Sequence, residues 1–127
     1  MKLATTGREP DLLYVAPETL NRLREKYLDG PADLAVEITS LASRARDRGE
    51  KFYEYEAGGV REYWLLDPDR EQAEFYVRDG RGIYQLALPQ DGVFESRVLP
   101  GLKLTVAWLW QDPLPPLLNV LKSWSLV

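Results

Sequence analysis

Short apolar runs, separated by proline and glycine, predict the elements in the first half of the chain. Residues 10–17, PDLLYVAP, are an apolar run of strand length between two prolines, and residues 32–40, ADLAVEITS, predict a buried strand. Between them, leucines and a tyrosine at helical spacing predict a helix over residues 18–29. A second helix is predicted over residues 44–58, because hydroxyl side chains that can cap it precede it and Gly58 and Gly59 end it.

The second half of the chain reads as strands and turns. Residues 60–68, VREYWLLDP, are rich in aromatic and branched side chains and predict a central strand. Residues 73–77 and 83–88 predict a hairpin, because the favoured turn pair Asp79 and Gly80 lies between them. Two more short strands are predicted over residues 93–99 and 101–110, and residues 113–127 predict a proline-rich joint and an amphipathic helix. The pattern as a whole predicts one α/β domain with a mixed sheet.

Length and composition agree with a single folded domain spanning residues 1–127. Residues 1–9 contain few apolar positions, and we expect them to be flexible. No segment is apolar enough to span a bilayer, and the first residues lack the apolar stretch of a signal peptide. We therefore expect a cytoplasmic protein without a membrane partner.

The chain contains no cysteine and no histidine, which narrows the chemistry that it can perform. Disulfides, thiolate metal sites, serine–histidine catalysis and the usual zinc sites are excluded. Carboxylates, lysine, tyrosine and hydroxyl groups are left, together with metals that bind oxygen, of which Mg²⁺ or Mn²⁺ fits best. The net charge of −4 argues against binding nucleic acid through an overall positive field, so a local patch is needed.

An acid in the middle of the second predicted strand is the main candidate for chemistry. Strand alternation places Glu37 on a face with small residues, where an unpaired carboxylate would be costly. Asp33 is about 13 Å from it along the strand, too far to share one metal ion. Asp11 opens the preceding strand and can approach Glu37, because paired strands lie about 4.8 Å apart. Lys51, on the following helix, can reach both acids and stabilise negative charge.

The segments PDLLYV, PADLAVEITS and RDRGEKFYEYEAGGVREYWLLDP resemble the Uma-two family of predicted endonucleases, over about residues 10–110. That family belongs to the PD-(D/E)XK superfamily, so the resemblance implies a restriction-endonuclease-like mixed β-sheet flanked by helices. It also implies metal-dependent hydrolysis of a nucleic acid, with Asp11 and Glu37 as metal ligands and Lys51 as the catalytic lysine. The superfamily has a lysine two residues after the acid, where this chain has Thr39. Family members carry more chain before the segment matching Pro10, so we expect an N-terminally short form.

Each candidate residue also has a purely structural interpretation. Glu37 can be an acid paired with an arginine, and Asp11 can be a turn or cap residue. Lys51 lies four residues after Asp47 and can form an exposed helical ion pair with it. The second-rank candidates are Ser40, which more often caps a helix, and Tyr55, which more often is a core aromatic with a bonded hydroxyl.

Arg44, Arg46 and Arg48 form a candidate nucleic-acid-binding patch, which can equally be a solvated helix face. The function that we expect is a metal-dependent nuclease, a hydrolase acting on DNA in preference to RNA, with a homodimer as a further expectation. The alternative is a catalytically silent or truncated family member that oligomerises or binds a partner through its C-terminal aromatic and helical segment. A DNA-binding regulator that uses the arginine patch is the third interpretation.

Overall fold

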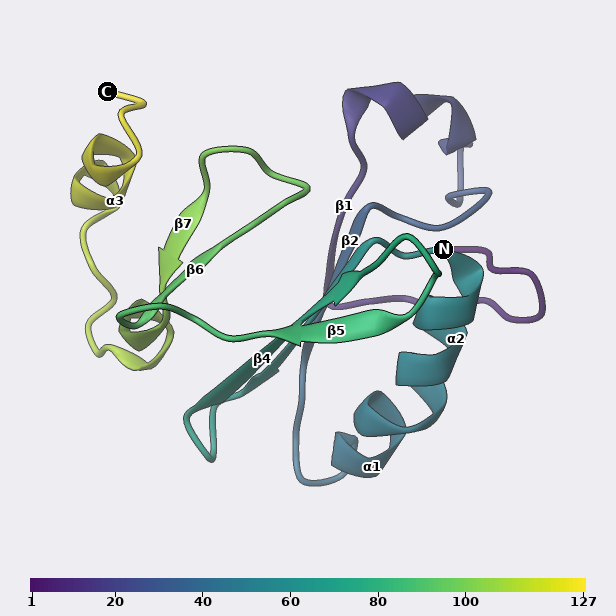
Figure 1. Cartoon of the computed structure of the whole chain (residues 1–127), viewed down its shortest axis with the longest axis horizontal. Coiled ribbons are helices and arrows are strands. Elements are labelled where there is room, and N and C mark those ends of the chain that lie inside the picture. The colour runs from purple at the N-terminus through teal and green to yellow at the C-terminus, as the bar shows by residue number, and fades with distance from the viewer.

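The computed structural model describes residues 1–127, which form seven strands and three α-helices. The strands are β1 (Leu12–Tyr14), β2 (Leu34–Ile38), β3 (Glu62–Asp67), β4 (Gln72–Arg78), β5 (Tyr84–Ala87), β6 (Val93–Glu95) and β7 (Lys103–Thr105). The first five form one mixed sheet in the order β1-β2-β3-β4-β5, and β6 pairs with β7 in a separate hairpin (Figure 1). Only β2 and β3 are parallel to each other.

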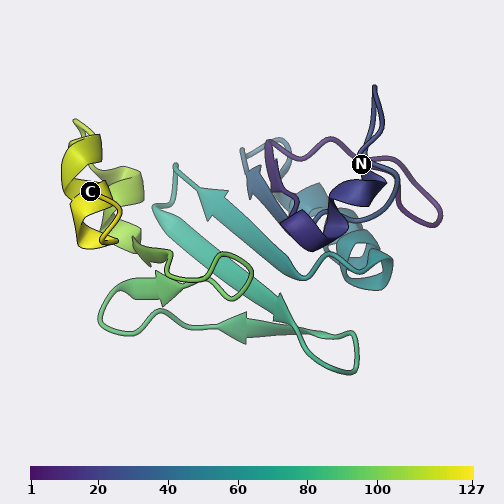
Figure 2. The same ribbon diagram turned by 90° about the horizontal axis from the view of Figure 1, so that it is seen from above.

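The helices cover one face of the sheet and one end of the molecule. Parallel strands need a crossover connection, and α1 (Arg44–Arg48) and α2 (Glu50–Gly58) provide it between β2 and β3. Two 3₁₀ helices, η1 (Pro17–Arg22) and η2 (Val106–Trp110), and a C-terminal helix, α3 (Leu117–Ser123), complete the fold. Figure 2 shows η2 and α3 at the opposite end of the molecule from the N-terminal segment and α2. None of the helices combines the length and the apolar composition that a membrane span requires.

The core consists of two clusters, one on each face of the sheet, and this confirms the predicted alternation along β2. Ala35 lies on the α2 face, whereas Leu34 and Val36 lie on the opposite face. The α2-side cluster contains Leu3, Ala35, Tyr55, Val60, Tyr63, Leu65 and Tyr84. The hairpin-side cluster contains Leu34, Val36, Trp64, Phe75, Phe94 and Val98.

Glu62, at the start of β3, ties the β6–β7 region to the main sheet. Its Oε2 accepts hydrogen bonds from Trp64 Nε1 and Ser96 Oγ, both at 2.8 Å, and its Oε1 accepts one from the Arg97 amide at 2.9 Å. The side chain is completely buried. A buried carboxylate with three donors is satisfied without a cation, so Glu62 has a structural explanation.

The predicted helix over residues 18–29 is wrong. Only residues Pro17–Arg22 are helical, and they form the 3₁₀ helix η1. Its leucines do not reach the core, because Leu20 and Leu23 are 51% and 59% exposed. The buried carboxylate of Asp33 instead fixes the turn by accepting hydrogen bonds from the Ala16 amide and the Thr19 hydroxyl. Hydrogen bonds to a residue that lies 14 and 17 positions further along the chain therefore decide the conformation of this segment, and the helical spacing does not.

The predicted helix over residues 44–58 exists but is divided in two. It breaks at Gly49, whose φ and ψ are −104° and −90°. It ends as predicted, at Gly59, where φ is +95°, a conformation that favours glycine. The predicted strand over residues 101–110 is also shorter, since only Lys103–Thr105 pair and the Trp-rich part that follows is the 3₁₀ helix η2.

Residues 1–9, for which the sequence predicts flexibility, make specific contacts with α2 and the chain around it. Leu3 is buried in the α2-side cluster, and the Lys2 amide donates to the Leu28 carbonyl at 2.8 Å. Arg8 forms an ion pair with Glu54, with Nε 2.6 Å from Oε2. This segment leads directly to Asp11, so its contacts with α2 help to set the position of β1.

Candidate active site

Glu37 is buried in the middle of the sheet and is met by a lysine. The side chain is 2% exposed and lies on the α2 face, as the strand alternation predicts. Lys51 Nζ is 2.8 Å from Glu37 Oε2, and the Tyr55 hydroxyl donates to the same oxygen at 3.0 Å. The cation that makes a buried acid tolerable at this position is therefore supplied by α2.

Asp11 lies beside Glu37 because β1 and β2 are antiparallel. The register pairs Leu12 with Val36, which brings the preceding residue, Asp11, opposite Glu37. The Asp11 amide donates to Glu37 Oε1 at 3.2 Å, and Asp11 Oδ2 accepts a hydrogen bond from the Ile38 amide at 2.7 Å. The two acids are thus held side by side at the end of β1, with Asp11 exposed and Glu37 buried.

Asp47 is a second acid on the same lysine. Its Oδ1 is 2.9 Å from Lys51 Nζ, and its Oδ2 accepts a hydrogen bond from Ser43 Oγ at 2.8 Å. From the sequence, Lys51 was expected either to pair with Asp47 four residues before it or to contact Glu37. In the structure it makes both contacts. The pair is also not an exposed helical ion pair, because Asp47 is only 1% exposed.

The contacts between these groups favour their charged forms. Burial opposes the charge on Lys51, but its contacts with Glu37 and Asp47 outweigh burial and raise the pKa of the ammonium group. Burial likewise opposes ionisation of Asp47, but hydrogen bonds from Thr39, Lys51 and Ser43 outweigh it and lower the pKa of that carboxyl. At neutral pH the lysine is therefore a cation and Asp47 an anion.

Tyr55 is a hydrogen-bond donor to Glu37 and does not ionise. The residue is completely buried. Burial first, and then the charge of Glu37, raise the pKa of the phenol far above its usual range. Asp47, Lys51 and Tyr55 are spaced at i, i+4 and i+8, so one stripe of α1 and α2 faces Glu37.

The other candidates lie around this centre with different surroundings. Ser40 belongs to the turn before α1, where its amide donates to Ser43 Oγ at 2.9 Å. Arg44 is 2.9 Å from Asp67, and Arg48 is 2.5 Å from Glu74. Arg46 is exposed and forms no ion pair. Of the three arginines in the predicted patch, only Arg46 thus has a guanidinium without a carboxylate partner.

The donor set at the centre suits a hard divalent cation. Asp11, Glu37 and Asp47 carry three negative charges against one positive charge on Lys51. Carboxylate oxygens are the ligands that Mg²⁺ and Mn²⁺ prefer. No group of three acidic side chains converges in metal-binding geometry. Asp11 and Glu37 could hold an ion only together with water or phosphate oxygens, which is the usual pattern for Mg²⁺.

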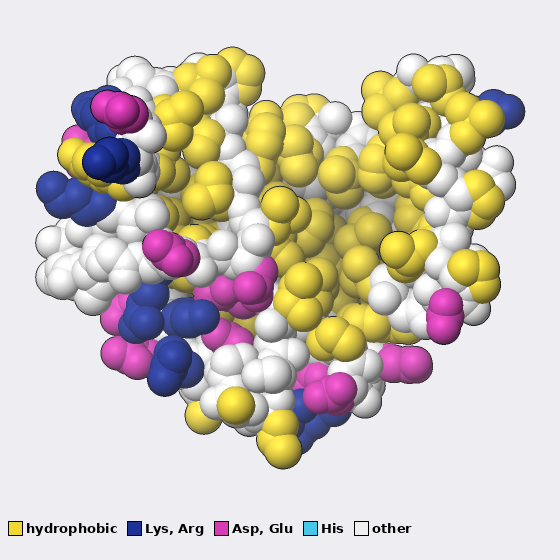
Figure 3. Space-filling view, turned by 180° about the vertical axis from the view of Figure 1, so that it is seen from behind, with side chains coloured by type: hydrophobic (Ala, Val, Ile, Leu, Met, Phe, Trp, Pro, Cys, Tyr) yellow, Lys and Arg dark blue, Asp and Glu magenta, His cyan; other side chains and the backbone are white.

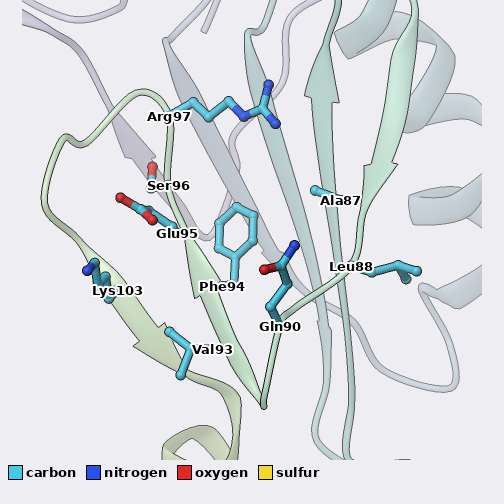
Figure 4. A pocket seen from close by; sticks show the side chains of 9 residues that line it. All are labelled: Ala87, Leu88, Gln90, Val93, Phe94, Glu95, Ser96, Arg97 and Lys103. Carbon is cyan, nitrogen blue, oxygen red and sulfur yellow. The ribbon is translucent and has the colours of Figure 1, made fainter.

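A wide hollow lies away from these acids. It has a volume of about 550 Å³ and is lined by residues of β6 and its neighbours, among them Phe94, Arg97 and Lys103 (Figure 4). Phe94 belongs to the cluster on the sheet face opposite α2. The carboxylates of Asp11 and Glu37 are not part of it. The candidate site is therefore defined by its charged side chains and not by a cavity.

The Uma2 family model, whose description is "Putative restriction endonuclease", matches residues 1–107. The chain belongs to the Uma2 family. The resemblance found in the sequence is thereby confirmed, and the mixed sheet with flanking helices is the restriction-endonuclease-like fold that it implied. No curated protein matches the chain.

Sequence reasoning missed two features of this Uma2 site. Asp47 was considered only as a surface partner of Lys51, although it is buried against it. Tyr63, whose hydroxyl donates to the Asp47 carbonyl at 2.8 Å, was predicted only as one of the aromatic side chains of the strand over residues 60–68. The signal for Asp47 was present in the sequence, because its spacing from Lys51 and Tyr55 places all three on one stripe. The Tyr63 contact had no such signal, since β3 and α1 are joined there only by tertiary packing.

Proposed function

We propose that this Uma2 protein is a divalent-metal-dependent nuclease that hydrolyses phosphodiester bonds in DNA in preference to RNA. The observation that carries the proposal is the meeting of Asp11, Glu37 and Lys51 at one place in a restriction-endonuclease-like fold. Two acids can hold a divalent metal and a lysine can stabilise developing negative charge, and both contributions to phosphodiester hydrolysis are open to a chain without histidine and cysteine.

Asp11 and Glu37 would hold Mg²⁺ or Mn²⁺, and such an ion supplies an activated water and offsets charge on the phosphate when it is bound. The lysine has a separate role. An ammonium group has three N–H donors, and two acids lie within ion-pair distance of Lys51 Nζ: Glu37 at 2.8 Å and Asp47 at 2.9 Å. Two of the donors suffice for these acids. The third is available for an oxygen of the scissile phosphate, where it stabilises the charge that develops during hydrolysis.

Nucleic-acid binding would rely on a small number of contacts. The chain has a net charge of −4, so binding must be local and strongly dependent on salt. We assign a phosphate contact to Arg46, which is exposed and without an acidic partner. Arg44 and Arg48 instead hold α1 to β3 and β4 through Asp67 and Glu74.

Cleavage of supercoiled plasmid, single-stranded DNA and RNA by the purified chain tests the proposal. The proposal predicts cleavage of DNA with Mg²⁺ or Mn²⁺, none with EDTA, and none for Glu37→Gln. Glu95→Gln is the matched control, because Glu95 is an exposed acid on β6 and should leave cleavage unchanged. Cleavage that persists in EDTA or in Glu37→Gln would contradict the proposal, and so would the lack of cleavage on every substrate.

A second candidate function is an interaction module that pairs with a second copy of itself. The molecule exposes 8057 Å², whereas a compact monomer of 14.6 kDa exposes about 6,900 Å². The excess is comparable to the roughly 800 Å² that each partner buries in a stable complex. Figure 3 shows a hollowed face with hydrophobic side chains on its floor and along both sides. Exposed apolar residues on that side of the sheet and on α3 include Leu12, Ile38, Leu117 and Leu118.

We therefore propose a homodimer that buries this face. Light scattering after size exclusion should give twice the monomer mass, and Leu117→Glu with Leu118→Glu should give the monomer mass. The same double substitution should leave the Asp11 and Glu37 contacts intact, because α3 lies at the other end of the molecule (Figure 1). A monomer at 100 µM wild-type protein would contradict the dimer.

A further inference from the structure

Asp47 is the only buried residue of α1, and it is a carboxylate. A short helix that only had to pack on the sheet would bury an apolar side chain, since burying an acid costs free energy unless its partners satisfy it. The partners of Asp47 are Lys51, at 2.9 Å, and Ser43, at 2.8 Å. The contacts with Lys51 and Ser43, and not packing on the sheet, therefore explain why an acid occupies this buried position.

The position of Asp47 is fixed from three directions. Ser43 Oγ, which donates to it, is itself 3.3 Å from Thr39 Oγ1, immediately after β2. The Tyr63 hydroxyl, from β3, donates to the Asp47 carbonyl at 2.8 Å. Arg44 joins the first turn of α1 to Asp67 at 2.9 Å. Because α1 and α2 are separated by the break at Gly49, these contacts set where Asp47 stands relative to Lys51.

We propose that Asp47 is a positioning residue that holds the Lys51 ammonium between itself and Glu37. Without Asp47, all the donors of Lys51 would be free to turn toward Glu37, the one remaining carboxylate within reach. With Asp47 in place, the ammonium is shared, Glu37 keeps part of its charge for a cation, and the third N–H keeps a fixed direction. The catalytic consequence rests on the proposed nuclease function, whereas the restraint on Lys51 does not.

Nuclear magnetic resonance of the lysine ammonium group tests the restraint directly, without any activity. Lys51 is the one lysine that is not exposed, so its ammonium signal should be visible in ¹⁵N-labelled protein and absent from Lys51→Arg. Asp47→Asn keeps the shape of the side chain and should increase ammonium rotation and hydrogen exchange at least tenfold. Glu50→Gln, an exposed acid on α2 next to Lys51, is the matched control and should change neither. An unchanged Lys51 signal in Asp47→Asn would overturn the inference.

Should Asp47→Asn fail to fold, Ser43→Ala provides the same test, because it removes the hydroxyl that holds Asp47 Oδ2 and leaves all charges in place. The expected result is a smaller but clear increase in Lys51 mobility, at least threefold. No increase in that variant would also overturn the inference.

A double-mutant cycle on cleavage tests the catalytic consequence. Asp47→Asn should lower kcat at least tenfold with KM changed less than twofold. In a Lys51→Met background the same substitution should lower kcat less than twofold, because Asp47 acts only through the lysine. An equal loss of kcat in both backgrounds would mean that Asp47 does not act through Lys51, and it would overturn the proposed effect of Asp47 on catalysis. If the wild type cleaves nothing, the proposed function fails, and the ammonium measurement still decides the inference.

Discussion

Replacing Lys51 with methionine removes the cation from a buried cluster and leaves two acids behind. Glu37 and Asp47 are 2% and 1% exposed, and Lys51 contacts both at 2.8 and 2.9 Å. Methionine has a similar length and can occupy the space of the lysine stem, so the loss reports mainly on charge.

The expected cost is large compared with the stability of a domain. Breaking a buried ion pair by removing one partner costs about 3–5 kcal/mol, because the other charge is left uncompensated. Domains of this kind are stable by about 5–15 kcal/mol in total. A loss of about 4 kcal/mol corresponds to a fall in Tm of roughly 12–20 °C at this chain length.

The cost should also depend on pH, in a direction fixed by the acids. In the wild type the pKa of Asp47 is lowered, since hydrogen bonds from Thr39, Lys51 and Ser43 outweigh burial. A pKa that is lower in the folded than in the unfolded state stabilises the fold at pH values above the unfolded pKa. This stabilisation is lost as pH falls through the folded pKa. In the variant, a buried acid without a cation has a raised pKa, so stability falls as pH rises through that value. The difference between the two proteins is therefore largest near pH 7 and shrinks toward pH 5.

Urea unfolding at pH 7 and pH 5, with EDTA present, measures both effects. Lys26→Met is the control, because Lys26 is exposed, and it should change the free energy of unfolding by less than about 0.5 kcal/mol. For Lys51→Met, the loss at pH 5 should be about half the loss at pH 7 or less. A loss below about 1 kcal/mol at pH 7, or an equal loss at both pH values, would refute the reasoning.

Three further substitutions test other contacts. Tyr55→Phe removes a hydrogen bond to the Glu37 carboxylate and should cost about 2 kcal/mol in urea unfolding, with no change refuting the contact. Glu62→Ala leaves three buried or half-buried donors without an acceptor and should lower the free energy of unfolding by about 3 kcal/mol or more. A loss as small as that of a surface substitution would contradict the structural role of Glu62. Arg46→Ala should leave Tm unchanged and reduce the salt slope of DNA binding by about one. Arg44→Ala should lower Tm, because it breaks the ion pair with Asp67. A lowered Tm for Arg46→Ala together with an unchanged Tm for Arg44→Ala would contradict the assignment of the patch.

The sequence could predict the features that depend on strand periodicity. Successive side chains of a strand point to opposite faces of the sheet. The alternation along β2 therefore correctly predicted that Glu37 lies on the face opposite to that of Leu34 and Val36. The approach of Asp11 to Glu37 followed from the spacing of paired strands, and the register confirms it. The contact between Lys51 and Glu37 was also predicted, because the crossover helix must pack on the same face.

Features that depend on tertiary hydrogen bonds could not be predicted in this way. The segment after Pro17 has helical spacing, but the buried Asp33 holds it as a 3₁₀ turn, and no local pattern encodes that contact. The helix predicted over residues 44–58 breaks at Gly49, and ion pairs of Arg44 and Arg48 tie its first part, α1, to β3 and β4; the helical pattern does not indicate these ion pairs. The burial of Asp47 follows from the same packing.

The most direct test of the central claim is diffraction from crystals of the protein soaked in Mn²⁺, measured at the manganese absorption edge. An anomalous peak is expected at the carboxylates of Asp11 and Glu37, and it should disappear in crystals of Glu37→Gln. A well-ordered crystal that shows no peak at these two residues, or a peak that persists in Glu37→Gln, would contradict the assignment of this Uma2 site as a metal-dependent active centre.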